Sequence, residues 1–164
     1  MRAQFLAFTF VAAVAASAAS AQTPMTQYMS DKDIMALIEK AKADRKNDAP
    51  LVPEPILQLA PYKAQLEYRP LKAPAALHEK DAELFVVLQG TGDIITGGKL
   101  VNEKRVNANN LGGSDIADGQ THHVVKGDML IVPNNTPHQV IPTGGAPIVV
   151  MTMHVPFPAP ANWP

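Results

Sequence analysis

The sequence predicts an all-β protein, a sandwich or barrel of short strands that follows a single helix. Short apolar segments recur from residue 83 to the C-terminus, and turn-forming residues separate them. The chain contains 15 prolines and ten glycines, which is typical of a protein with many turns. Strands that follow one helix, instead of alternating with several, favour a sandwich or barrel over an α/β fold.

Residues 1–21 have the pattern of an export signal. Arg2 precedes an apolar segment over residues 5–16, and the small residues 19–21 are suited to cleavage after Ala21. A membrane anchor is the alternative, but this segment is short and rich in Ser and Ala, whereas a span needs about 20 strongly apolar residues. No cysteine follows for lipid attachment. We therefore predict a periplasmic or secreted protein with no membrane insertion.

Composition limits the partners and the means of stabilisation. The formal net charge of −1 gives no sign of a nucleic-acid partner or of attraction to an anionic membrane. The chain has no cysteine, so after export its stability must come from packing and not from disulfides.

Residues 30–46 predict the helix. Ser30 is suited to the N-cap, and Asp33 can bond back to it from the third helical position. One apolar stripe recurs at helical spacing: Ile34, Leu37, Ile38 and Ala41. Six prolines between residues 50 and 74 then favour an extended arm or edge strands. We place a helix and proline-rich arm in residues 22–60 and the barrel in residues 61–164.

Within the barrel region the longest stretch without a strand pattern covers residues 102–120. It is rich in Asn, Gly and Asp. We predict a polar loop there, a candidate for covering the mouth of the barrel.

Two spaced motifs contain the candidate metal ligands. His78 is followed after four residues by Glu83, and Gly90 follows after six more. Gly127 is followed after five residues by Pro133, and His138 lies five positions further on. These patterns resemble the two motifs of the cupin superfamily. The resemblance covers residues 66–155 and implies a double-stranded β-helix (cupin, jelly-roll-like) barrel with an N-terminal helix and an extended arm.

The sequence departs from the cupin motifs at three positions. Ala76 stands where the first motif has its first histidine, so one of the usual four ligands is missing. Pro142 stands where the second motif ends in Asn. Asn135 replaces a glycine of that motif, an exchange that costs little because Asn tolerates left-handed backbone.

His78, Glu83 and His138 are the predicted metal ligands. Mixed nitrogen and oxygen ligands suit a divalent transition metal such as Fe, Mn, Ni, Cu or Zn, and two histidines with one carboxylate leave coordination positions open. Five positions separate His78 from Glu83, so residues 79–82 must turn for both to point inward. The alternative for Glu83 is a surface residue that begins a strand.

Four further residues are candidates for lining the pocket. If Glu83 points inward, then Phe85 and Gln89 share its face by strand alternation. Of the adjacent His122 and His123, parity with the neighbouring apolar residues favours His122, either as a hydrogen-bonded histidine or as the missing ligand. His154 ends the last strand and is either a strand-end residue or a pocket acid–base group.

Leu84, Val86 and Leu88, on the other face of the same strand, are also apolar and must be covered by the helix, the arm or a second subunit. The resemblance to small cupins implies a homodimer.

Two functions of different classes follow. One is a metal-dependent enzyme that acts on a small organic substrate as an oxygenase, lyase or isomerase. The other is a non-catalytic cupin that binds a small ligand, such as a sugar or sugar acid, or a metal. The open three-ligand site favours the first, and Ala76 favours the second.

Overall fold

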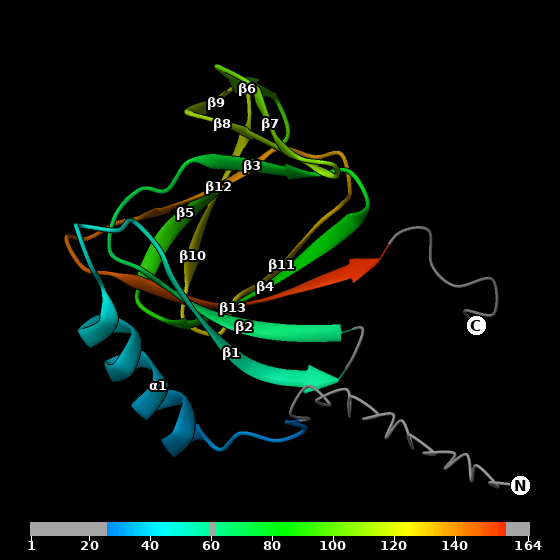
Figure 1. Ribbon diagram of the computed structural model, residues 1–164. Helices are drawn as coiled ribbons and strands as arrows, with labels where there is room; N and C mark the ends of the chain where they lie inside the picture. Colours follow the sequence, from blue (N-terminus) through cyan, green and yellow to red (C-terminus); the bar gives the residue numbers. More distant parts are fainter. Residues whose placement is uncertain (1–25, 60–61, 157–164) are drawn as a thin grey trace, which may run out of the picture.

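The computed structural model describes residues 26–59 and 62–156, and the predicted export signal lies outside them. Two antiparallel sheets face each other and form a barrel, and helix α1 (Asp31–Asp44) lies on the outside (Figure 1). The predicted all-β barrel with an N-terminal helix is therefore confirmed. Within the described ranges, no helix is long and apolar enough to cross a membrane.

Consecutive strands are divided between the two sheets. The five-stranded sheet has the order β1 (Val52–Leu59), β2 (Tyr62–Arg69), β13 (Ile148–Pro156), β4 (Asp81–Gln89) and β11 (Met129–Val132). The six-stranded sheet has the order β10 (Gln120–Val125), β5 (Thr91–Thr96), β12 (His138–Pro142), β3 (Ala75–His78), β8 (Asn110–Gly113) and β7 (Lys104–Asn107). The short strands β6 (Lys99–Val101) and β9 (Asp115–Ala117) pair separately.

Helix α1 begins and packs as its sequence predicts. The side chain of Ser30 accepts a hydrogen bond from the Asp33 backbone, and the Asp33 side chain bonds back to the Ser30 backbone. Ile38 and Ala41 are buried in a cluster on the outer face of the five-stranded sheet. This cluster covers part of the apolar outer surface of the barrel.

Proline in the arm is compatible with β structure because β1 is an edge strand. Pro53 and Pro55 lie in β1, which is the edge strand next to β2 and has one further bridge, between Gln58 and Thr26. An edge strand leaves one row of backbone groups unpaired, so proline removes no essential ladder bond there.

The interior is largely apolar. Phe85 and Val87 of β4 join inward-facing residues of the other strands in one core cluster: Ile94, Val124, Val132, Val140, Ile148 and Val150. Glu83 lies on the same face of β4, so alternation holds over the first part of this strand.

Gln89 is exposed and does not line the interior, contrary to the prediction. The pairing of β4 with β13 changes register between Val149 and Val150, and Leu88 is the extra residue. A bulge of this kind reverses the face on which later side chains lie. Gln89 consequently pairs with Val149, which belongs to the outer cluster under α1.

Residues 102–120 contain three strands, β7, β8 and β9, contrary to the predicted loop. The pairing partners of β8 and β9 are β3 and β6, which lie elsewhere in the chain. Backbone pairing therefore orders a segment whose polar composition alone suggests a loop. Gly113 is required in β8, because a Cβ there would lie 2.7 Å from the carbonyl oxygen of Val101.

Asn135 has a φ of 57°, in the left-handed region. This conformation confirms the prediction that Asn135 replaces a motif glycine at a left-handed position.

Candidate metal centre

The three predicted ligands meet inside the barrel. His78 is the last residue of β3, the chain turns at residues 79–80, and Glu83 lies in β4 of the opposite sheet. His138 is the first residue of β12. One carboxylate oxygen, Glu83 Oε2, lies 3.2 Å from His78 Nε2 and 2.9 Å from His138 Nε2.

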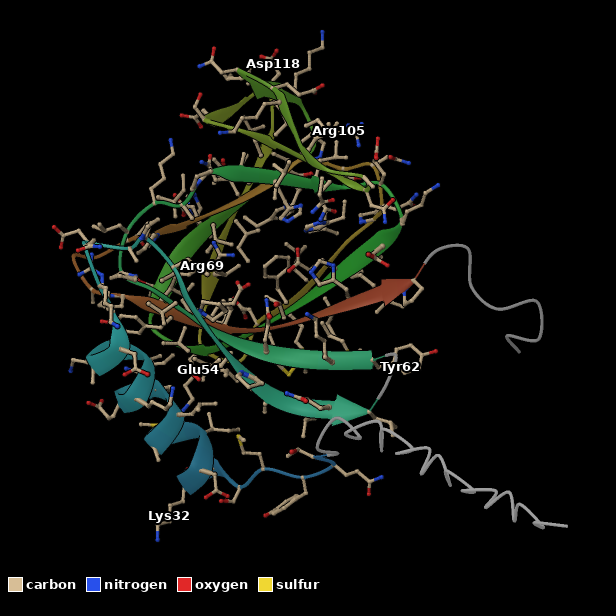
Figure 2. All side chains as sticks on the ribbon, viewed as in Figure 1. Lys32, Glu54, Tyr62, Arg69, Arg105 and Asp118 are labelled. Carbon is tan, nitrogen blue, oxygen red and sulfur yellow. The ribbon has the colours of Figure 1, made fainter. Side chains whose placement is uncertain are left out.

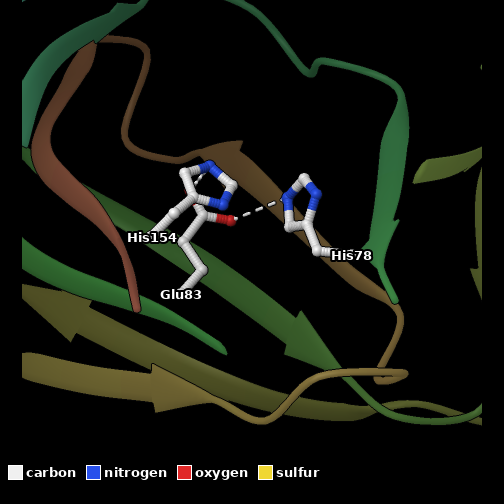
Figure 3. Close-up of side chains that lie close together, drawn as sticks. All are labelled: His78, Glu83 and His154. Atoms are coloured by element: carbon white, nitrogen blue, oxygen red, sulfur yellow. Dashed lines mark ion pairs between the residues drawn. The ribbon is translucent and has the colours of Figure 1, made fainter. Parts of the chain in front are cut away.

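His154 approaches the same carboxylate from β13. It is the direct cross-strand partner of Glu83, and its Nε2 lies 3.7 Å from Glu83 Oε1. Its ring packs against that of His78 with 4.5 Å between the centroids, and Figure 3 shows both rings beside the carboxylate. Possible ligand atoms of His78, Glu83 and His154 all lie within 4.8 Å of one another. His154 is therefore a pocket residue and a fourth candidate ligand.

The spacing of these atoms suits one metal ion. Ligand atoms bonded at about 2.1 Å to the same ion lie about 3.0 to 3.4 Å from each other in octahedral or tetrahedral geometry. The contacts of Glu83 with the three imidazoles span 2.9 to 3.7 Å. The possible ligand atoms that lie close enough together for one ion belong to His78, Glu83 and His154, and His138 adjoins this cluster through Glu83 Oε2.

Two of the imidazoles are oriented by hydrogen bonds on the far side of the ring. His138 Nδ1 lies 3.2 Å from the backbone carbonyl oxygen of Thr136, and His78 Nδ1 lies 2.9 Å from Asn110 Oδ1. Both oxygens accept a hydrogen bond, so each Nδ1 carries a proton and each Nε2 is the ring nitrogen that faces Glu83. This arrangement is typical of histidines that bind a metal through Nε2.

The electrostatics favour a cation at Glu83. Burial alone raises the pKa of the Glu83 carboxyl, but the contacts with His138 and His78 outweigh it and hold this pKa well below its usual range. Burial lowers the pKa of His154, which is therefore a neutral imidazole near pH 7. Glu83 is only 4% exposed, and a buried carboxylate requires hydrogen-bond donors or a bound cation for compensation.

Phe85 and His122 lie on the inner surface but do not belong to the cluster of His78, Glu83 and His154. The ring of Phe85 is 5.7 Å from that of His138 and forms an apolar wall. His122 is half-buried and its Nε2 lies 3.1 Å from Thr96 Oγ1, whereas His123 is exposed beside Asp93. His122 is a hydrogen-bonded histidine of the barrel wall.

Asn110, which orients His78, was not predicted from the sequence as a site residue. It lies in residues 102–120, and the pairing of β3 with β8 places it directly opposite His78. Its distance from His78 along the sequence leaves no local signal of this contact.

The inner face of β2 carries charged residues that were also not predicted to lie inside. Glu67 and Arg69 are buried, and Arg69 lies between the two sheets (Figure 2). Glu67 Oε2 accepts hydrogen bonds from Arg69 Nε and Nη2 at 2.9 and 2.6 Å, and Glu67 Oε1 accepts one from Gln65 at 3.0 Å. The hydroxyl of Thr152, opposite Gln65, is buried and has no hydrogen-bond partner in residues 26–59 and 62–156. One side of the interior is therefore polar.

Comparisons with known proteins agree with this architecture. No protein-family model and no curated protein matches the sequence. Among solved structures, a Klebsiella pneumoniae protein with a double-stranded β-helix domain is 13% identical, with a TM-score of 0.54 over 82% of this chain and 94% of that one. The chain has the cupin fold.

Two further structures share this cupin barrel. A Bacillus halodurans protein is 13% identical, with a TM-score of 0.51 over 82% of this chain and 85% of its own. The Fe(II) form of HppE is 14% identical, with a TM-score of 0.50 over 68% of this chain and 53% of its own. Identities this low show the fold alone.

Proposed function

We propose that this cupin binds one divalent transition metal ion through His78, Glu83, His138 and His154. The observation that supports this most strongly is the convergence of three imidazoles on one buried carboxylate. Nitrogen and oxygen ligands of this kind suit Fe, Mn, Ni, Cu or Zn.

In this proposal His154 replaces the histidine that is absent at Ala76. The motif position on β3 lies opposite His138 in the six-stranded sheet, whereas His154 comes from the five-stranded sheet. The ligand number is thus kept at four, although one ligand comes from a different strand. Ala76 then no longer argues for a site without metal.

Four protein ligands leave two positions open on a six-coordinate ion, which is the arrangement that catalysis needs. When bound, the metal supplies Lewis-acid or redox chemistry to a small organic substrate, in a reaction of the oxygenase, lyase or isomerase type. The apolar wall formed by Phe85 and the core cluster limits the access of water. Glu83 provides the negative charge of the site, and the hydrogen bonds of Asn110 and Thr136 hold two imidazoles in place.

Calorimetric titration of metal-free protein with Mn, Fe(II), Ni, Cu and Zn tests the proposal. We expect binding of one ion per chain, and its loss in His138→Ala. His123→Ala is the matched control, because His123 also contacts a carboxylate, 2.6 Å away, but lies on the surface. The absence of binding by every ion, or equal binding by His138→Ala, would show that the proposed ligands are wrong.

A separate measurement shows whether the bound metal has open coordination positions. With Mn(II) bound, exchangeable water on the metal should enhance the relaxation of solvent protons. A bound metal with no such enhancement would indicate a closed, non-catalytic site.

We also propose that this cupin acts outside the cytoplasm, because residues 1–21 have the pattern of an export signal. N-terminal sequencing of protein recovered from the periplasm or medium should begin at Gln22. An intact N-terminus on cell-associated protein would contradict export.

A further inference from the structure

A cavity of about 560 Å³ adjoins His78 on the side of β3, β8 and β7. These three strands lie side by side in the six-stranded sheet, across the barrel from β4 and β13 (Figure 1). The volume is within the range of small-molecule sites, about 300 to 1,000 Å³. His78 lines the cavity and also contacts Glu83, so the cavity borders the candidate metal centre at this ligand.

Two small residues, Ala76 and Gly112, line the cavity. Ala76 pairs directly with Gly112 on one side and with His138 on the other, so the surface beside the ligand His138 carries only a methyl group and a hydrogen. Ala76 is also the position of the histidine in the cupin motif. A histidine at this position would occupy space that this chain leaves open beside the metal centre.

The cavity has an unneutralised positive charge. Lys104 pairs with Gly112 and lines the cavity, and its exposed side chain has no ion pair or hydrogen bond among the described residues. Arg105 also lines it, but both of its terminal nitrogens contact the Glu79 carboxylate, at 2.6 and 2.9 Å (Figure 2). No aspartate or glutamate is among the lining residues.

Asn110 adds a hydrogen-bond donor. Its Oδ1 is engaged by His78, and its Nδ2 has no partner within the described part of the chain. A ligand oxygen in the cavity can therefore accept a hydrogen bond from Asn110 and pair with the ammonium group of Lys104.

We propose that this cavity is the substrate pocket of the metal centre and that it takes a small organic carboxylate. The carboxylate pairs with Lys104, and the rest of the molecule lies over Ala76 and Gly112 and reaches the metal beside His78. The inference rests on the proposed metal site for the orientation of the ligand, but the binding of the carboxylate is measurable without metal.

Succinate and its neutral diamide, succinamide, are suitable probes for NMR titration of metal-free and zinc-loaded protein. We expect succinate to shift the backbone amide signals of Asn110 and Gly112, and succinamide to bind at least tenfold more weakly. Lys104→Met should weaken succinate binding at least tenfold, whereas Lys99→Met, an exposed lysine outside the cavity, should leave it unchanged. Ala76→Leu should block succinate while zinc still binds.

Three results would overturn the pocket: no succinate-dependent shift, succinamide binding as tight as succinate binding, or Lys104→Met within twofold of the parent protein. Zinc titration of each protein separates this failure from that of the metal site. If zinc does not bind but succinate binding depends on Lys104, the metal proposal fails and the pocket stands. If zinc binds and succinate does not, the pocket proposal fails and the metal proposal stands.

Discussion

The Glu67–Arg69 pair inside the barrel allows a quantitative test of the interior. Glu67→Gln removes the negative charge but keeps the shape of the side chain. Arg69, which is only 8% exposed, then loses the anion that now accepts its two hydrogen bonds. Removal of one partner of a buried ion pair destabilises a protein by about 3 to 5 kcal/mol.

We expect the lower end of that range, about 3 kcal/mol, because the glutamine oxygen still accepts one hydrogen bond. With a urea m-value of about 2 kcal/mol per M, the midpoint of unfolding should fall by about 1.5 M. The double variant Glu67→Gln/Arg69→Met removes both charges and should recover most of the loss.

Urea unfolding of metal-free protein, followed by circular dichroism, measures both variants. Glu103→Gln is the control, because Glu103 is exposed and its loss should change the free energy of unfolding by less than about 0.5 kcal/mol. A loss below about 1 kcal/mol in Glu67→Gln, or a double variant as unstable as the single one, would refute the reasoning.

Three other changes test separate features. Thr152→Val removes a buried hydroxyl that has no partner among the described residues, and it should raise the free energy of unfolding by about 1 kcal/mol. A decrease in the urea midpoint would mean that the hydroxyl is hydrogen-bonded. Asn110→Ala frees the His78 ring and should weaken zinc binding about 10- to 100-fold by calorimetry, whereas the control Asn109→Ala should not change it. If Asn110→Ala binds zinc as tightly as the parent protein, Asn110 does not belong to the site. The predicted homodimer would use the apolar outer face, on which Ile131 of edge strand β11 is 57% exposed. Light scattering should then give a dimer that Ile131→Lys dissociates, and a monomeric parent protein would contradict it.

Local patterns in the sequence predicted the fold well. The capping residues of α1 and the stripe of Ile38 and Ala41 depend on neighbours within one or two helical turns, so the sequence alone carries them. The spacing of His78 and Glu83 likewise requires a turn between two strands, which the structure contains.

The residues whose positions were not predicted correctly depend on contacts between segments that are distant in the sequence. Gln89 faces outward because of a bulge against β13, some sixty residues away in the chain, and single-strand alternation contains no sign of it. Asn110 and Lys104 join the site through strand pairing in a segment that resembles a loop. His154 was ambiguous because its partner, Glu83, lies in a strand far earlier in the sequence.

The most direct test of the central claim is X-ray absorption spectroscopy of the zinc-loaded protein. We predict a first shell that contains three imidazoles and one carboxylate, and the loss of one imidazole in His154→Ala. A shell with two imidazoles that His154→Ala leaves unchanged would contradict the role of His154, and a shell without histidine would contradict the metal centre as a whole.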